Sequence, residues 1–303
     1  MIMQRREKYE YDGDALIVNA PAKVNIYLLI AGKRPDGFHE IDTLMTKIAW
    51  YDSLRFEKRK SGGVVLRCDG TYRAPEDESN LVLRAVRRIV SMLGIAEPDL
   101  QITLTKNLPA GAGLGGASSD CAATIQGLDK FLSLGMNEEQ MFEVASELGS
   151  DIAFFLGGPT ARCRGRGELV EPVKIDNSDC VFTLFLPCIH CSTPEVYKKY
   201  RHNAVLYKKN IADIESMLKH KPDFQQLVNK RLNMLEKACF KAYPSMKTFH
   251  DQCVKCNLKL NLSGSGSIFY AVKSGYIMES AYTNVIITFG DTCARVEACS
   301  NRW

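Results

Sequence analysis

Residues 108–123 carry the clearest chemical signal in this sequence. Four glycines, Gly111, Gly113, Gly115 and Gly116, are followed by Ser118 and Ser119. Glycines let backbone N–H groups approach a ligand closely, and the N–H groups that begin a helix lack partners and carry partial positive charge. The pattern is typical of a turn that binds phosphate. The alternative is a flexible turn whose two serines cap the next helix.

The residues on either side predict the elements that would hold this turn. Residues 100–105 alternate between apolar and polar side chains, as a β-strand does, and Ala122, Ile125 and Leu128 recur at helical spacing. The order is therefore strand, glycine-rich turn and helix. It is not a Walker loop, because no Gly-Lys-Ser/Thr follows, and its glycine spacing does not match the dinucleotide fingerprint.

A second polar group lies near the N-terminus, where residues 15–30 predict one strand, or two strands broken at Pro21. Alternation gives one face with Lys23, Asn25 and Tyr27 and an opposite face with Val24, Ile26 and Leu28. A lysine and an asparagine two residues apart on a strand face could converge on one ligand. An exposed strand edge is the alternative.

Two more sites have both a structural and a functional interpretation. Asp151 follows a predicted helix end at Gly149 and precedes apolar residues, so it could cap the next helix or act as a catalytic carboxylate in a partly dry pocket. Phe38 and His39 follow the turn predicted by Pro35-Asp36-Gly37. They could be structural, or they could stack on a base and hydrogen-bond to it.

Composition limits the class of protein. The chain has 303 residues, 46% hydrophobic and 24% charged, with a net charge of +4, which favours a globular protein of two domains with a sizeable core. The modest charge predicts neither a nucleic-acid partner nor a membrane surface, and no apolar run approaches the roughly 20 residues of a membrane helix. Without an apolar signal segment we expect a cytoplasmic protein. Monomer and homodimer both remain open.

Four of the eleven cysteines form two Cys-x-x-Cys pairs, Cys188/Cys191 and Cys253/Cys256. Zinc binding is one interpretation, but the pairs lie far apart, and Cys253 falls on a predicted apolar helix stripe with Met246 and Phe249. Reduced thiols in a cytoplasm are the prediction we favour.

The remaining elements follow from periodicity and turn residues. We expect strands at 43–48, 52–58, 63–68, 181–187 and 268–272, a strand pair within 285–297, and helices at 80–92, 137–148, 224–241 and 244–256. Residues 198–210 predict a solvated face or loop. Residues 162–168 lie near a domain boundary and predict a solvated hairpin, with arginines near a phosphate as the alternative.

Three motifs in this order carry a family resemblance: residues 21–25 (Pro-Ala-Lys-Val-Asn), the glycine-rich residues 109–119, and residues 262–267 (Leu-Ser-Gly-Ser-Gly-Ser). The set resembles the superfamily of galactokinase, homoserine kinase, mevalonate kinase and phosphomevalonate kinase. With residues 34–39 and 148–155 included, the chain is similar to its 4-diphosphocytidyl-2-C-methyl-D-erythritol kinase family, from about residue 18 to 272.

The resemblance implies an α+β fold with a ribosomal-protein-like N-terminal α/β domain at 1–165, which would bind ATP and carry out catalysis. A ferredoxin-like C-terminal domain at 166–303 would lie on the substrate side. The implied reaction transfers the γ-phosphoryl group of ATP, with Mg²⁺, to the 2-hydroxyl of 4-diphosphocytidyl-2-C-methyl-D-erythritol, a step of non-mevalonate isoprenoid precursor biosynthesis.

The resemblance also implies residue roles. Asp151 takes or orients the hydroxyl proton, and Lys23 holds Asp151 ionised and steadies the charge in transfer. The ATP phosphates would contact Pro109, Gly111, Gly113, Leu114, Gly115, Gly116, Ser118 and Ser119. Mg²⁺ would be held by ATP and Ser119. The substrate would contact Asn25, Leu28, Phe38, His39, Tyr197, Gly264 and Ser265, with the cytosine between Phe38 and Tyr197.

Two rival functions make different demands. Another kinase of the superfamily, acting on homoserine or a mevalonate-type substrate, gives no reason for Phe38 and His39. A non-catalytic nucleotide-binding protein on this fold would be expected to lack Lys23 or Asp151, and both are present.

Overall fold

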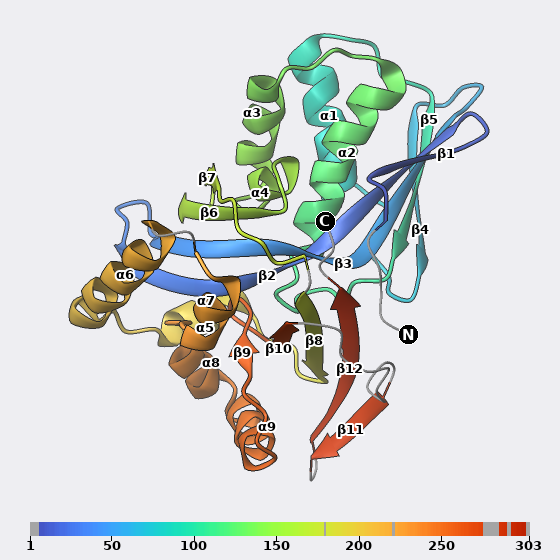
Figure 1. Ribbon diagram of the computed structural model, residues 1–303. Coiled ribbons are helices and arrows are strands. Elements are labelled where there is room, and N and C mark those ends of the chain that lie inside the picture. The colour runs from blue at the N-terminus through green and yellow to red at the C-terminus, as the bar shows by residue number, and fades with distance from the viewer. Residues whose placement is uncertain (1–5, 179, 220–221, 275–284, 290–291, 301–303) are drawn as a thin grey trace.

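The computed structural model describes residues 6–178, 180–219, 222–274, 285–289 and 292–300. Two β-sheets and their helices form a mixed α/β fold (Figure 1). The first sheet contains β1 (Tyr9–Asp12), β2 (Ala15–Lys33), β3 (His39–Lys58), β4 (Val64–Gly70), β5 (Leu100–Lys106), β6 (Thr160–Gly165) and β7 (Leu169–Pro172). The second contains β8 (Cys180–Pro187), β9 (Asn261–Leu262), β10 (Phe269–Ser274), β11 (Val285–Phe289) and β12 (Thr292–Ser300).

The long antiparallel strands β2 and β3 form the centre of the first sheet. The strand order is β1-β2-β3-β5-β4, and β6 pairs with the other end of β3 and with β7. Strands β4 and β5 are parallel and are connected through a helix. In Figure 1 four helices lie above this sheet: α1 (Leu81–Leu93), α2 (Gly116–Leu132), α3 (Glu138–Leu148) and α4 (Ile152–Leu156).

The second sheet is antiparallel, with β8 at its centre in the order β11-β12-β8-β10-β9. The predicted strands at 181–187 and 268–272 and the predicted terminal pair are therefore confirmed. Five further helices belong to this half of the chain: α5 (Thr193–Lys199), α6 (Ala204–Lys219), α7 (Phe224–Lys230), α8 (Glu236–Ala242) and α9 (Pro244–Lys255).

Buried side chains join the two sheets. Val24 and Ile26 of β2 belong to one apolar cluster with Phe182 of β8 and Tyr270 of β10. The opposite face of the first sheet packs against the helices above it through a separate cluster. Because burial of apolar area is the main stabilising term, β2 and β3 are held from both sides. The polar side chains that β2 carries are correspondingly rigid.

A β-bulge in β2 changes the predicted alternation. Asn25 faces Met45 and Tyr27 faces Leu44 across the pair, so Ile26 is an extra residue. Beyond it the side chains change face. Leu28, rather than Tyr27, lines the cavity with Lys23 and Asn25, and Tyr27 is buried in the cluster with Val24. The prediction that Tyr27 shares the face of Lys23 was wrong.

Helix starts were predicted well, and several extents were not. Asn80 caps α1, and Asn137 with Gln140 forms the predicted capping box of α3. The separate strands expected at 43–48 and 52–58 are one strand, β3, and the helix expected at 224–241 is divided into α7 and α8. The loop predicted at 198–210 includes the start of α6, because Ile214 of that helix is buried in the core. Across the described residues, no helix is both long and apolar enough to cross a membrane.

Candidate active site

A cavity of about 920 Å³ opens where β2, the glycine-rich loop, α4, α5 and the 262–267 turn meet. Its lining includes both predicted catalytic residues and most of the predicted ligand contacts: Lys23, Asn25, Leu28, Phe38, His39, Pro109, Gly111, Gly113, Leu114, Gly115, Gly116, Ser118, Asp151, Tyr197, Gly264 and Ser265. The fold therefore gathers residues that are up to 242 positions apart, from Lys23 to Ser265, around one space.

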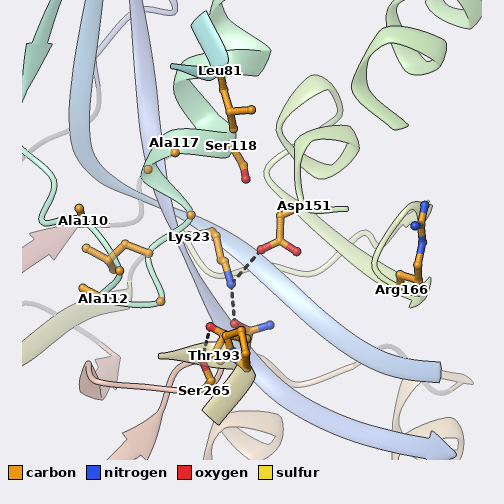
Figure 2. A pocket seen from close by; sticks show the side chains of 18 of the residues that line it. Lys23, Leu81, Ala110, Ala112, Ala117, Ser118, Asp151, Arg166, Thr193 and Ser265 are labelled. Carbon is orange, nitrogen blue, oxygen red and sulfur yellow. Dashed lines mark hydrogen bonds and ion pairs between the residues drawn. The ribbon is translucent and has the colours of Figure 1, made fainter. Parts of the chain in front are cut away.

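Lys23 and Asp151 form the polar centre of this cavity. Lys23 Nζ lies 3.4 Å from Asp151 Oδ2, a contact marked by a dashed line in Figure 2. The same ammonium group donates to Asn25 Oδ1 at 2.7 Å. Asp151 stands at the N-cap position of α4, but its side chain makes no capping hydrogen bond. Its carboxylate instead faces the lysine and the cavity, so the capping alternative does not describe its side chain.

Asn25 is held by its neighbours on every side. Its Nδ2 donates to Thr43 Oγ1 at 2.9 Å, its backbone N–H donates to Ser263 Oγ at 3.3 Å, and Oδ1 accepts from Lys23. Thr43 in turn donates to the carbonyl of Tyr27 at 2.5 Å. A buried, fully partnered amide keeps one orientation, so Asn25 fixes the position of the Lys23 ammonium group.

The glycine-rich loop requires glycine for two separate reasons. Gly113 and Gly115 both have φ in the left-handed region, at 82° and 71°. A Cβ atom at Gly113 would lie 2.9 Å from Ser263 O, and one at Gly115 would lie 2.8 Å from the Phe155 ring. The loop is also tied to β2, because Lys23 N donates to Leu114 O at 2.9 Å.

The predicted order of strand, glycine-rich turn and helix is confirmed, but the roles of the two serines differ. Helix α2 begins at Gly116 with Gly115 at the N-cap and no side-chain cap, so neither Ser118 nor Ser119 caps it. Adjacent helical residues point about 100° apart. Ser118 lines the cavity (Figure 2), whereas Ser119 is 1% exposed and lines a separate small cavity behind the helix. This orientation contradicts the prediction of Ser119 as a phosphate and Mg²⁺ ligand.

A buried ionic cluster at the base of the loop was not predicted. Lys106 Nζ donates to Asp52 Oδ2 and, at 2.7 Å, to Asp120 Oδ2. Asp52 Oδ1 accepts the backbone N–H groups of Asn107 and Leu108 at 2.6 and 2.8 Å. The cluster thereby links the strand before the loop to the helix after it. Lys106 falls in phase with the buried Leu100, Ile102 and Leu104 of β5, and that phase is the signal that could have revealed it.

Burial and charge act against each other in this cluster. Burial alone would lower the pKa of Lys106, but Asp120 and Asp52 outweigh it and raise the pKa above its usual value. Burial, reinforced by the Asp52 charge, raises the pKa of Asp120 well above its usual range despite Lys106. Asp120 Oδ1 is buried and finds no hydrogen-bond partner among the described residues.

Aromatic residues gather at the end of the cavity away from the glycine-rich loop. The rings of His39 and Tyr197 lie 4.8 Å apart, and Tyr200 packs edge-on against the same imidazole. Phe38 is 54% exposed, which leaves its ring open to a ligand. Burial lowers the pKa of His39, with smaller contributions from Lys33 and His202, so the imidazole is neutral at pH 7 and can both donate and accept a hydrogen bond.

The 262–267 turn completes the wall. Ser265 Oγ and Thr193 Oγ1 are 2.8 Å apart, a contact visible in Figure 2, and Asn233 Nδ2 donates to the carbonyls of Leu262 and Gly264 at 2.9 and 2.8 Å. Ser192 holds the N-cap position of α5, and the Thr193 hydroxyl contacts the turn.

Comparisons with known proteins identify the family of this chain. Residues 80–158, from the cap of α1 to the end of α4, match the profile described as GHMP kinases N terminal domain. A 4-diphosphocytidyl-2-C-methyl-D-erythritol kinase of Macrococcus caseolyticus is 35% identical over 84% of this chain and 89% of its own length. This chain belongs to the 4-diphosphocytidyl-2-C-methyl-D-erythritol kinase family.

Solved structures place this kinase in the same fold group. The crystal structure of a 4-(cytidine 5'-diphospho)-2C-methyl-D-erythritol kinase superposes with a TM-score of 0.66 at 30% identity, covering 86% of this chain and 90% of that one. A homoserine kinase from Cytophaga hutchinsonii gives 0.67 at 22% identity, covering 89% and 88%. At 22% identity, the likeness to the homoserine kinase concerns the fold alone. The overall fold therefore does not distinguish a cytidyl acceptor from homoserine.

The cysteine pairs of this kinase lie outside the cavity. Cys253 is buried with Met246 and Phe249 in one apolar cluster, as the helical stripe predicted. Cys191 is buried in the same cluster, and Cys188 and Cys256 are exposed. No group of three or more His, Cys, Asp or Glu side chains in the described part of the chain is arranged to hold a metal ion.

Proposed function

We propose that this chain transfers the γ-phosphoryl group of ATP to the 2-hydroxyl of 4-diphosphocytidyl-2-C-methyl-D-erythritol, a step of isoprenoid precursor biosynthesis. The observation that carries the proposal is the Lys23–Asp151 pair between a glycine-rich loop and an aromatic pocket. The first subsite suits a polyphosphate and the second suits a base. The relatives at 31–37% identity carry the name of this kinase.

Asp151 is proposed to accept the proton of the attacking hydroxyl, or to orient that hydroxyl. Its carboxylate faces the cavity without a capping role. Lys23, fixed by Asn25 at 2.7 Å, balances the negative charge that spreads over the transferred group. Phosphoryl transfer depends mainly on positioning and on charge stabilisation, so the position of the carboxylate matters more than its strength as a base.

The glycine-rich loop and the start of α2 are proposed to bind the ATP phosphates. Backbone N–H groups at a helix N-terminus favour anions, and the positive φ values of Gly113 and Gly115 shape the approach. Mg²⁺ is part of the same proposal, since hard oxygen donors are at hand in Ser118 Oγ and in Asp120 Oδ1, which has no hydrogen-bond partner among the described residues. When bound, Mg²⁺ would neutralise negative charge on the polyphosphate.

Phe38, His39 and Tyr197 are proposed to bind the cytosine. The exposed Phe38 ring offers a stacking face, and the neutral imidazole of His39 can donate to or accept from the polar edge of the base. In the unliganded arrangement Tyr197 packs on His39, so Tyr197 supports the imidazole as well as bordering the base. Leu28, Gly264 and Ser265 would border the acceptor.

The division of the chain is also a proposal. The two sheets suggest an N-terminal α/β domain of ribosomal-protein-like type and a C-terminal domain of ferredoxin-like type. Because β7 pairs with β6 in the first sheet, we place the boundary after Pro172 rather than at residue 165. We further propose a cytoplasmic location, where the cysteines stay reduced.

The test is release of ADP in the presence of Mg²⁺ and ATP, measured in parallel with diphosphocytidyl methylerythritol, homoserine and mevalonate as acceptors. Turnover on the cytidyl substrate alone is expected. Turnover on another acceptor would contradict the assignment of the aromatic pocket. Binding of ATP without turnover on any of the three would contradict the kinase activity itself.

A further inference from the structure

Arg166 is a cationic residue of the cavity wall, and it has no role in the proposed mechanism. It lies in the turn between β6 and β7 and lines the cavity. Its guanidinium carbon lies 5.2 Å from the centre of the Phe38 ring, so it borders the aromatic pocket. Its side chain is 33% exposed, which leaves it accessible to a ligand.

The arginines of this hairpin differ in how they are paired. Arg162 Nη2 lies 2.5 Å from Asp42, and Arg164 Nη2 lies 3.1 Å from Glu171. Arg166 has a carboxylate only at 3.9 Å, from its Nε to Glu168 Oε1. The other oxygen of Glu168 accepts the backbone N–H of Arg166 at 2.6 Å. Within the described residues the Arg166 guanidinium makes no hydrogen bond, so its forked donors are available.

The same turn reaches the catalytic carboxylate. A Cβ atom at Gly167, the next residue, would lie 3.4 Å from Asp151 Oδ1. In the view of Figure 2, Arg166 lies on the opposite side of Asp151 from the glycine-rich loop. Arg166 therefore borders the ring of Phe38, and the residue that follows it borders the carboxylate of Asp151.

The proposed substrate, on which this inference rests, has matching chemistry. It consists of a cytidine and a methylerythritol joined by a diphosphate, which bears two negative charges. With the base at Phe38 and the reacting hydroxyl at Asp151, the diphosphate must pass between them. We infer that the guanidinium of Arg166 binds this diphosphate and so selects a nucleotide-linked acceptor over a free polyol.

The physical match is specific to arginine. A planar guanidinium donates two parallel hydrogen bonds to a phosphate while its face remains on an aromatic ring. Lys33 and Lys198 also line this end of the cavity, but Lys198 is paired with Glu195 at 2.5 Å. A lysine presents a single compact charge without the fork.

The inference is tested by binding, with the ATP site saturated by AMP-PNP so that pyrimidine ligands report on the acceptor site. Calorimetry compares CDP with cytidine for the wild type, for Arg166→Gln and for the control Arg164→Gln on the same hairpin. We expect CDP to bind the wild type about tenfold or more tighter than cytidine, as hydrogen bonds to charged groups predict. Arg166→Gln should remove most of that preference and leave cytidine binding unchanged, and Arg164→Gln should preserve it.

Three results would overturn the inference. The first is equal weakening of CDP binding and cytidine binding by Arg166→Gln, which would leave Arg166 a stacking role only. The second is no change in the binding of either ligand. The third is an equal loss of the preference for CDP in the Arg164→Gln control. In turnover, Arg166→Gln should raise KM for the cytidyl substrate about tenfold, with kcat and the KM for ATP within about twofold. If the wild type binds CDP as described but does not phosphorylate the cytidyl substrate, the proposed function fails and the binding role of Arg166 stands.

Discussion

The ammonium group of Lys23 and the carboxylate of Asp151 lie 3.4 Å apart, although the two residues belong to elements 128 positions apart in the chain. Lys23 is 6% exposed at its side chain and Asp151 is 34% exposed. The lysine is therefore held inside the protein, and the carboxylate is the member of the pair that meets the cavity. This asymmetry suits a fixed cation and an approachable base.

Replacing Asp151 by Asn should lower kcat by about 10²–10⁴-fold, the usual contribution of a positioned base. The amide keeps the size and removes the charge. Binding of ATP, measured by calorimetry, should change little, because the phosphates are assigned to the loop and α2. Asp12→Asn, at an exposed acid of β1 that does not line the cavity, serves as the matched control. Near-normal turnover of the Asn variant would remove Asp151 from the mechanism.

Replacing His39 by Ala should raise KM for the cytidyl substrate about tenfold, the loss of roughly one good hydrogen bond. The KM for ATP should stay within about twofold. Steady-state kinetics with each substrate varied in turn gives both values, and His202→Ala, which leaves the ring pair of His39 and Tyr197 in place, is the comparison. Equal increases in both KM values would mean that His39 supports the whole cavity rather than the base.

Replacing Lys106 by Met should lower the free energy of unfolding by about 3–5 kcal/mol, because two buried carboxylates lose the cation between them. Asp120→Asn keeps an acceptor for Lys106 and removes one of two neighbouring negative charges, so its loss should stay below about 1 kcal/mol. Urea unfolding of both variants supplies the test. A Met variant as stable as the wild type would show that the cluster does not hold the ends of the glycine-rich loop together.

The buried Lys47 predicts a pH dependence of stability. Burial, with a smaller effect of Lys8, lowers its pKa to about 7. Between pH 7 and about 10 the unfolded chain binds a proton at this lysine that the folded chain does not, so the free energy of unfolding should rise with pH. In Lys47→Met the free energy of unfolding should rise less steeply with pH, and the difference in slope should approach about 1.4 kcal/mol per pH unit. Parallel pH profiles of the two proteins would refute this.

Local patterns predicted the parts of the site that local physics controls. The strand, the glycine-rich turn and α2 follow from residues adjacent in sequence, and so does the capping box of Asn137 and Gln140. The side-chain directions of Ser118 and Ser119 depend on where the helix begins, and an error of a residue or two there moves a hydroxyl out of the cavity. The pairing of Lys106 with Asp52 and Asp120 requires knowledge of which strands are neighbours.

The resemblance to a family supplied what periodicity could not. Lys23 and Asp151 were ambiguous on spacing alone, and only their joint presence with the glycine-rich loop made them a pair. Arg166 shows the converse. Its hairpin was predicted to be solvated, with a position near phosphate as the alternative. Which arginine has a guanidinium free to bind a ligand is visible only once Arg162 and Arg164 are seen with their carboxylates.

Because of the bulge at Ile26, odd-numbered and even-numbered residues exchange faces part-way along β2. Before it, odd-numbered residues such as Lys23 and Asn25 face the cavity, and after it the even-numbered Leu28 does. Deleting Ile26 would remove the bulge and leave Asn25 opposite Met45 and Tyr27 opposite Leu44, so Leu28 would still face the cavity. The bulged residue therefore affects the bend and twist of β2, and which side chains meet the cavity does not depend on its presence.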